Sequence, residues 1–351
     1  MRQQVLIPSD NFDFVANFAE GYRKLGFDVS AGRINFELEC RKYDILHFLW
    51  PEELTNWQRP TSDQIDQVLA RLDRWAKHSK IIISVNNLYP HGYDKDPAFH
   101  RLYVGFYERA NVIHHFSNAS KDAVFREFPS TVLYNHIAHV GFNYERLLPK
   151  FKIDRAAARR SFGFAAEDMV FLAFGTLRFW EEARLLMQAF GSANVSGRKL
   201  LLATRYNGYG ASWRQRMRRW RWHVWSKTDR ITAITDRISD AQLPGLFAAA
   251  DAIIVIRQNS ISSGVPSLAM TFGRFVIAPN FGGIAEYLDG TENILYDEFS
   301  ALDLSKAMER ASIADRERVG DSNALIASRW GWEDIVRSCV DALSSKVFHR
   351  K

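Results

Sequence analysis

The chain has 351 residues, of which 47% are hydrophobic and 25% are charged. This composition excludes a disordered protein, and the length exceeds what one ordinary hydrophobic core organises, so we expect two domains. No apolar run approaches the roughly 18 residues that cross a bilayer. The first residues, MRQQVLIPSDN, lack the apolar stretch of a signal peptide, so we expect a cytoplasmic protein.

The net charge of +6 favours a polyanionic partner, which could be nucleic acid, an anionic membrane surface or a phosphorylated small molecule. Basic residues concentrate in residues 150–160 and 213–227. Cys40 and Cys339 lie far apart without metal-type spacing, so we expect neither a disulfide framework nor a zinc site, and we expect both in the core.

The second basic segment has the pattern of an amphipathic helix. Apolar side chains recur at helical spacing, and three arginines lie on another face: Trp213, Met217, Trp220 and Val224, against Arg214, Arg218 and Arg221. Two interpretations remain open. The aromatic side chains pack on their own domain, or the helix adsorbs to a membrane surface.

In the first half of the chain, predicted strands and helices alternate. Strands are expected at residues 4–7, 43–49, 80–85, 112–115 and 131–134, and helices at 14–25, after Thr61, at 98–110 and at 120–128. Thr61 and Gln64 form a capping box for the second of these helices. Alternation of this kind predicts a parallel sheet covered on both faces.

A second alternating series follows a charged, proline-containing segment at residues 141–162, where we place the linker. Strands are expected at 169–174 and 199–203, and helices at 179–190, at 213–227 and after Ser239. The predicted fold is therefore α/β, with two doubly wound Rossmann-like domains and a cleft between them. We assign residues 1–150 and 151–331 to the two domains, and residues 332–351 to a terminal helix that could pack back on the first.

Residues 250–283 carry the most informative loop of the chain. A predicted strand at 252–256 runs into the polar loop 257–264, then into a helix at 265–272 and a strand at 275–278. This order places Ser260, Ser262 and Ser263, with nearby backbone N–H groups, at a helix start where a phosphate is favoured. Ordinary caps and turns explain the same residues equally well. P-loop and dinucleotide-binding motifs are absent, which disfavours a dehydrogenase.

Five motifs in chain order carry a family resemblance. They are residues 44–52 (DILHFLWPE), 86–91 (NNLYPH), 174–178 (FGTLR), Ala250 with Asp251, and Ser263 with Gly264 through Ala269 and Met270 to Pro279. The chain resembles the GT-B glycosyltransferases of bacterial exopolysaccharide assembly, of the broad family 4 type. It is most similar to xanthan-type GDP-mannose:glycolipid β-mannosyltransferases.

The resemblance implies an N-terminal domain that binds the acceptor and a C-terminal domain that binds a nucleotide sugar. Arg178 would neutralise the donor diphosphate, with the donor loop supplying amides and hydroxyls. The implied donor residues are Gly175, Arg178, Ser260, Ser262, Ser263 and Gly264, and the acceptor-side residues are Asp10, Asn11 and Asn87. If the enzyme inverts, His91 or Glu52 is the favoured general base. No metal is strictly required, and no cofactor is expected beyond the nucleotide-sugar co-substrate.

The resemblance implies transfer of a hexose, with GDP-mannose the best single donor, onto a polyprenyl-diphosphate-linked oligosaccharide. An anionic membrane at the inner face of the plasma membrane is then the expected partner surface, without nucleic acid. Glu181, Ser260 and Leu268 stand where relatives usually carry a lysine and two glutamates. A non-catalytic or nucleic-acid-binding protein on a GT-B scaffold is therefore the alternative, and retention or inversion of configuration stays open.

Overall fold

The computed structural model describes residues 2–151, 153–204, 213–234, 236, 238–258, 261, 263–297 and 299–344, apart from the side chains of residues 12 and 13. The chain divides into two compact units. Unit 1 comprises Met1–Phe142 with Trp330–Lys351, and unit 2 comprises Asn143–Arg329. Among the described residues, no helix combines the length and the apolar character that crossing a bilayer requires.

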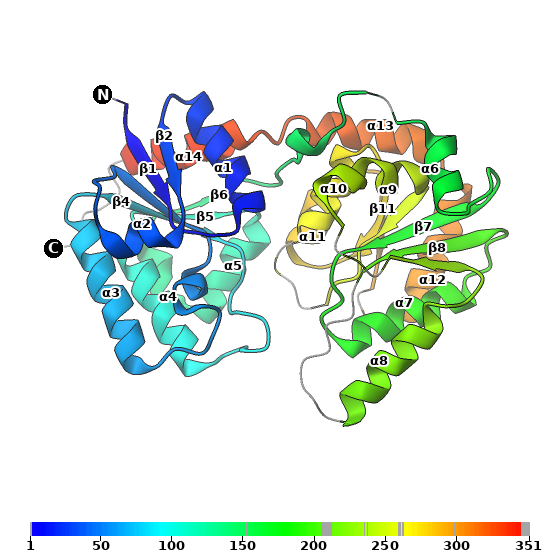
Figure 1. Ribbon diagram of the computed structural model, residues 1–351, viewed down its shortest axis with the longest axis horizontal. Coiled ribbons are helices and arrows are strands. Elements are labelled where there is room, and N and C mark those ends of the chain that lie inside the picture. Colours follow the sequence, from blue (N-terminus) through cyan, green and yellow to red (C-terminus); the bar gives the residue numbers. More distant parts are fainter. Residues whose placement is uncertain are drawn as a thin grey trace. The chain divides into compact units, whose positions relative to one another are not determined.

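Unit 1 is built on a six-stranded sheet in the order β2-β1-β3-β4-β5-β6, and every neighbouring pair is parallel. Helices α1 and α14 lie on one face, and α3 and α4 on the other (Figure 1). The strands are β1 (Gln4–Ile7), β2 (Asp28–Ala31), β3 (Ile45–Phe48), β4 (Lys80–Val85), β5 (Val112–His115) and β6 (His136–Ala138). The α-helices are α1 (Phe12–Lys24), α2 (Arg33–Leu38), α3 (Ser62–Ala76), α4 (Pro97–Arg109), α5 (Asn118–Glu127) and α14 (Trp332–Ser344).

The last described helix packs on the first. A Cβ atom at Gly21 in α1 would lie 2.5 Å from the carbonyl oxygen of Trp332, so only glycine permits this approach. The Trp332 ring meets Phe18 edge to face at 4.8 Å. Residues of α14 therefore complete the core of unit 1, although most of unit 1 and the whole of unit 2 lie between α1 and α14 in the sequence.

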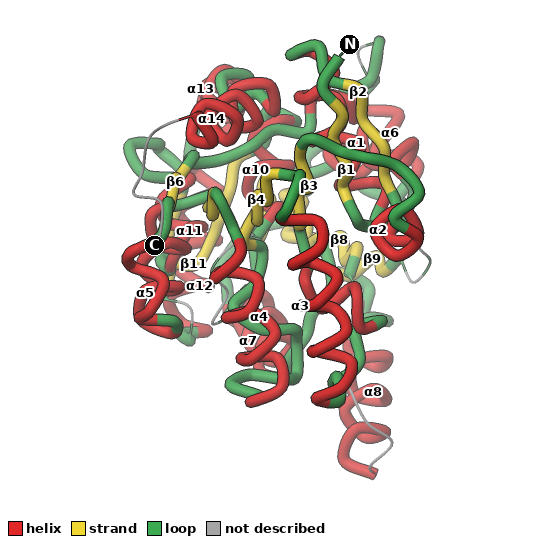
Figure 2. Tube along the Cα trace, turned by 90° about the vertical axis from the view of Figure 1, so that its left-hand side faces the viewer, coloured by secondary structure: helices red, strands yellow, loops and turns green. Residues whose placement is uncertain are grey.

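Unit 2 has a second parallel six-stranded sheet, in the order β12-β11-β10-β7-β8-β9. Helices α7 and α12 cover one face, and α9, α10 and α13 the other (Figures 1 and 2). The strands are β7 (Met169–Phe174), β8 (Arg198–Ala203), β9 (Ile231–Ala233), β10 (Ala252–Ile254), β11 (Phe275–Pro279) and β12 (Ile294–Tyr296). The α-helices are α6 (Arg155–Ser161), α7 (Trp180–Ser192), α8 (Trp213–Trp225), α9 (Leu243–Ala249), α10 (Gly264–Thr271), α11 (Gly282–Tyr287), α12 (Ala301–Ile313) and α13 (Arg316–Ala327).

Two sequence-based expectations in unit 1 were wrong. The strand expected at residues 131–134 is a tight 3₁₀ turn at Pro129–Leu133, in which Thr131 Oγ1 donates to the carbonyl of Phe128. The strand comes later, as β6, because only there does the chain reach the edge of β5. Cys40, expected in the core, is exposed.

Other elements also escaped prediction. β2, α2, β9, α11 and β12 are too brief to establish a hydrophobic period. The sequence analysis also placed no helix at α12 or α13, although these helices have 13 and 12 residues. Residues 143–150, which the sequence analysis assigned to the first domain, are part of unit 2. The Asn143 amide donates to the carbonyl of Ala327, and the Tyr144 N–H donates to Thr271 Oγ1.

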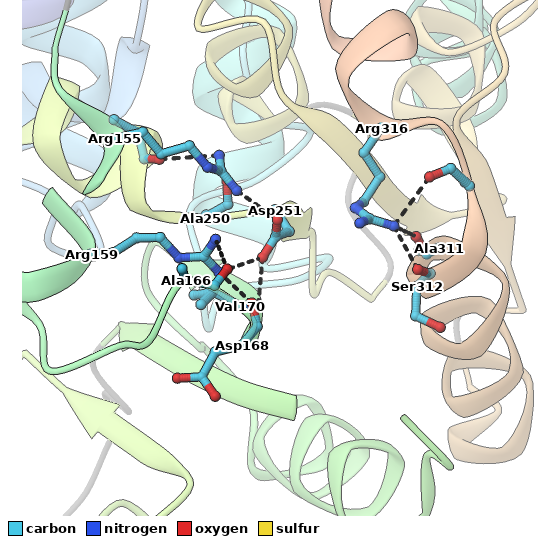
Figure 3. Close-up of polar contacts among 12 residues, drawn as sticks. Arg155, Arg159, Ala166, Asp168, Val170, Ala250, Asp251, Ala311, Ser312 and Arg316 are labelled. Atoms are coloured by element: carbon cyan, nitrogen blue, oxygen red, sulfur yellow. Dashed lines mark hydrogen bonds and ion pairs between the residues drawn. The ribbon is translucent and has the colours of Figure 1, made fainter. Parts of the chain in front are cut away.

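A carboxylate directly before β10 ties α6 to the sheet of unit 2 (Figure 3). Asp251 Oδ1 pairs with Arg155 at 2.6 Å, and Asp251 Oδ2 pairs with Arg159 at 2.9 Å. The same Oδ2 accepts the N–H of Val170 at the start of β7. Arg159 also donates to the carbonyls of Ala166 and Asp168. Basic residues of the 150–160 cluster therefore serve the fold of unit 2.

Replacing Asp251 by Asn should destabilise unit 2 by about 3 kcal/mol, since it leaves largely buried Arg159 without its counter-charge. Urea unfolding followed by circular dichroism measures the change. Glu292→Gln is the matched control, because it breaks an ion pair with Arg318 that is exposed on both sides. Equal effects of the two substitutions would contradict a structural role for the buried network.

Candidate functional site

Each sheet contains one point where the strand order reverses. In unit 2 the chain runs outward from β7 through β8 to β9, and then returns to place β10 on the other side of β7. In unit 1 the corresponding point lies between β1 and β3. Loops that leave neighbouring strands there part in opposite directions and open a crevice at the carboxyl ends of the strands, where ligands of open α/β sheets bind.

The unit 2 crevice begins with Gly175, the first residue after β7. Its φ of +95° belongs to the region that favours glycine. A Cβ atom there would lie 3.0 Å from Nη2 of Arg257 and 3.5 Å from Cγ2 of Val265. The loops after β7 and β10 and the start of α10 therefore meet at this glycine.

A buried carboxylate fastens the two loops together. Glu182, in the first turn of α7, is fully buried. Its Oε2 accepts the N–H groups of Arg178 at 2.7 Å and Phe179 at 3.3 Å, and its Oε1 accepts the N–H of Gln258 at 3.2 Å. Both loops are thus held by one side chain.

The crevice also holds a buried cation. Arg257 follows β10, is 7% exposed, and donates through Nη1 to the carbonyl of Ile256 at 2.6 Å. Burial lowers the pKa of Arg257, and the negative charge of Glu182 opposes that shift. A guanidinium remains charged at any physiological pH, so this edge of the sheet carries fixed positive charge.

The donor-loop residues predicted from the sequence fall into two groups. Ser263 is the N-cap of α10, its Oγ accepts the N–H of Val265 at 3.3 Å, and Gly264 is the first residue of the helix. Ser260 and Ser262 lie outside the described residues. Arg178 is partly exposed, directly before α7, and Gly175 lies at the end of β7. Four of the predicted residues thus lie in the loops and the helix start that follow β7 and β10, namely Gly175, Arg178, Ser263 and Gly264.

Sequence reasoning missed Arg257 and Glu182. A signal existed for the first, because an arginine that directly follows an uninterrupted apolar strand must begin a strand-end loop. Glu182 lies three residues after Phe179 and accepts its N–H, but nothing in the sequence indicates that it also holds Gln258. That contact depends on the pairing of β7 with β10.

In unit 1, the corresponding crevice is lined by acidic residues and one arginine. Glu53 Oε1 accepts the N–H of Asp10 at 2.6 Å. Arg33 donates through Nε to Asp10 Oδ2 at 2.6 Å, and through Nη1 to the carbonyl of Glu53 at 2.7 Å. The hydrogen bond from Arg33 holds the pKa of Asp10 below its usual range. Asp10 is therefore an ionised residue at the carboxyl end of β1.

Glu52 points into the protein. Its side chain is fully buried, and Oε2 accepts a hydrogen bond from Tyr103 of α4 at 2.6 Å. Burial raises the pKa of Glu52 to about 7, although hydrogen bonds from Tyr103 and Asn87 oppose the shift. In this conformation Glu52 offers no exposed atom to a substrate, which weakens its case as a general base.

The remaining acceptor-side residues lie at the same edge of the sheet. Asn11 is exposed and precedes α1, and its N–H donates to Ser9 Oγ at 3.2 Å. Asn87 and His91 both follow β4, the first partly exposed and the second exposed. Of the two predicted general bases, His91 is the one that solvent reaches.

Two parallel, doubly wound α/β units, each with a crevice at its reversal point, define a GT-B fold. No family model and no curated protein matches the sequence. Several solved structures, however, are similar to the structure of this chain. Sucrose-phosphate synthase from Thermosynechococcus elongatus superposes with a TM-score of 0.74 at 16% identity, covering 97% of this chain and 98% of that one.

Two further similar structures are HepE from Anabaena and a trehalose-phosphate synthase. HepE in complex with UDP-glucose has a TM-score of 0.73 at 16% identity, covering 98% of this chain and 100% of that one. The UDP-forming α,α-trehalose-phosphate synthase from Burkholderia xenovorans has a TM-score of 0.68 at 11% identity, covering 99% and 100%. The chain therefore shares the fold of GT-B glycosyltransferases over nearly its whole length.

The raised pKa of Glu52 predicts that the free energy of unfolding depends on pH. A carboxyl whose pKa is higher in the folded state contributes stability below its unfolded value, near 4.5, and loses it as the pH rises through about 7. The Glu52→Gln variant has no titratable group at this position, so it does not lose this stability as the pH rises. The variant should therefore gain about 2 to 3 kcal/mol of unfolding free energy relative to the parent protein between pH 5 and pH 8.

Urea unfolding at the two pH values measures this gain. Glu37→Gln on α2 is the control, because Glu37 is exposed, and it should show no pH-dependent difference. A Glu52→Gln variant whose relative stability does not change with pH would contradict the buried, proton-binding state of this side chain.

Proposed function

We propose that the protein is a nucleotide-sugar-dependent glycosyltransferase that moves a hexose onto a polyprenyl-diphosphate-linked oligosaccharide. The observation that carries the proposal lies at the reversal point of the unit 2 sheet, where Gly175 is next to Arg257 and the start of α10. Glu182 holds the backbone N–H of Arg178 beside them. Positive charge and a helix N-terminus at such a point suit a diphosphate.

The proposed reaction breaks the bond between the sugar C1 and the diphosphate oxygen, and forms a bond from C1 to an acceptor hydroxyl oxygen. Negative charge grows on the departing nucleoside diphosphate as the bond breaks. Arg178 and the amide groups beside Ser263 and Gly264 then stabilise the transition state more than the ground state. In an inverting reaction, the acceptor proton passes to a general base.

Two kinds of donor nucleotide are candidates for the proposed reaction. The family resemblance implies GDP-mannose, whereas the similar structures include HepE bound to UDP-glucose and a UDP-forming synthase. UDP-hexoses therefore stand beside GDP-mannose as candidate donors. We propose His91 as the base of an inverting reaction, with Asp10, Asn11 and Asn87 on the acceptor side, because His91 is exposed and Glu52 is enclosed.

A lipid-linked acceptor would be presented at a membrane surface. We propose that the protein works in the cytoplasm, peripherally bound to the anionic inner face of the plasma membrane. The net charge of +6 supports this location, since anionic headgroups attract basic surfaces.

A panel of nucleotide sugars, including GDP-mannose and UDP-glucose, tests the proposal through release of nucleoside diphosphate with and without a polyprenyl-diphosphate oligosaccharide. No binding and no turnover with any donor would contradict it. Salt-dependent binding of DNA or RNA in place of donor binding would instead support the non-catalytic alternative.

Arg178→Ala should lower turnover by about 10²–10³-fold with the preferred donor, as expected for removing one donor to the leaving group. The loop should keep its conformation, because Glu182 holds the backbone N–H of Arg178 rather than its side chain. Arg184→Ala, an exposed arginine on α7, is the matched control. Similar turnover in both variants would show that Arg178 does not act on the diphosphate.

His91→Gln should lower acceptor-dependent turnover by about 10²–10⁴-fold and leave donor affinity unchanged, if His91 takes the acceptor proton. Steady-state kinetics and donor titration measure the two quantities separately. His78→Gln, an exposed histidine before β4, should have no effect on either. Normal turnover in the His91 variant would remove it as the base.

A further inference from the structure

Helix α8 carries apolar side chains that are exposed on the surface of unit 2. In the part of the chain that the structure describes, the side chains of Trp213, Met217, Trp220 and Val224 are 65%, 46%, 57% and 46% exposed. At 100° per residue these four positions fall within about 60° of arc, so they form one narrow stripe along the helix. We call this the α8 stripe. These four side chains are therefore about half exposed or more, rather than buried in the described part of unit 2.

The opposite face of α8 anchors the helix to unit 2. Trp222 and Trp225 pack against the unit 2 core, and the Trp225 ring stacks on Trp180 of α7 at 5.2 Å. Arg218 lies over the same Trp180 ring and pairs with Glu181 at 3.9 Å. Figures 1 and 2 show α8 beside α7 with one end projecting past it. The α8 stripe therefore faces away from the core that holds the helix.

Charge distinguishes among the surfaces that could cover the α8 stripe. The helix sequence WRQRMRRWRWHVW contains five arginines and no acidic residue. On the helical wheel, Arg216 flanks the stripe on one side, and Arg214 and Arg221 flank it on the other. A second copy of the same helix would bring like charges together, which disfavours self-association.

The apolar side chains point to a lipid rather than a nucleic acid. Met217 and Val224 gain from leaving water, but they have no ring to stack on a base. Tryptophan is favoured at the boundary between headgroups and acyl chains, where its ring is buried and its N–H stays hydrated. Arginines beside an apolar stripe can keep their charge among anionic headgroups while their stems cover apolar surface.

We infer that α8 is a membrane-interface helix, whose stripe of Trp213, Met217, Trp220 and Val224 inserts among the headgroups of an anionic lipid surface. Arg214, Arg216 and Arg221 then contact the lipid phosphates. This inference rests on the proposed action at a membrane-linked acceptor. It assigns the membrane attachment to unit 2 rather than to unit 1.

The test measures sedimentation of the full-length protein with vesicles of phosphatidylglycerol and phosphatidylcholine, and with phosphatidylcholine alone. The parent protein should bind the anionic vesicles, with weaker binding at high salt. Trp213→Ser with Trp220→Ser should weaken binding at least tenfold, and so should Arg216→Gln with Arg221→Gln. Quenching of tryptophan fluorescence by brominated lipid should fall in the tryptophan variant.

The matched control is Ile313→Ser with Leu325→Ser, which removes two exposed apolar side chains of unit 2 outside α8. Thermal unfolding checks that every variant is folded, as expected for changes at exposed positions. Undiminished vesicle binding by the tryptophan variant would overturn the inference. Vesicle binding absent from the parent protein, with the α8 stripe instead mediating self-association or nucleic-acid binding, would overturn it too.

Donor binding in solution separates this inference from the proposed function. The α8 variants should bind the nucleotide sugar like the parent protein, because the helix lies outside the crevice residues described above. Loss of vesicle binding with unchanged donor affinity supports both proposals. If no nucleotide sugar binds but the α8 variants lose vesicle binding, the proposed transfer reaction fails while the membrane-interface role of α8 stands.

Discussion

The candidate donor site depends on the parallel pairing of β7 with β10, two strands that about 80 residues of chain separate. This pairing places the loop after one strand beside the loop after the other, and Glu182 then joins them by accepting N–H groups from both. A single buried carboxylate can do this because its two oxygens accept hydrogen bonds in different directions. The backbones of the two loops are therefore fixed relative to each other.

Electrostatics differ between the two crevices. In unit 2, Arg257 is a buried cation and Arg178 is a partly exposed one, beside the amino-terminal end of α10. In unit 1 the corresponding loops present Asp10 and Glu53, with Arg33 paired to Asp10. The strand-end loops of unit 2 thus carry two arginines and the buried Glu182, whereas those of unit 1 carry two carboxylates and one arginine.

The positive charge of the chain serves three separate purposes. Arg155 and Arg159 pair with Asp251 and stabilise unit 2. Arg178 and Arg257 lie at the crevice, and the arginines of α8 lie on the surface around an exposed apolar stripe. Net charge alone could not separate these roles, because it counts charges without regard to whether a counter-ion lies next to them. The basic cluster at 150–160 shows this, since its structural partner Asp251 lies more than 90 residues away.

The sequence by itself determined the α/β class, the parallel sheets and most of the longer elements, because apolar runs and caps such as Thr61 with Gln64 act over a few residues. It also placed Gly175 and Arg178 after a strand and Ser263 at a helix start. Only the tertiary structure decided that Glu52 is enclosed, that Glu182 and Arg257 belong to the crevice, and that the α8 stripe is exposed. Burial and long-range hydrogen bonds depend on which strands become neighbours. Local periodicity does not specify that choice.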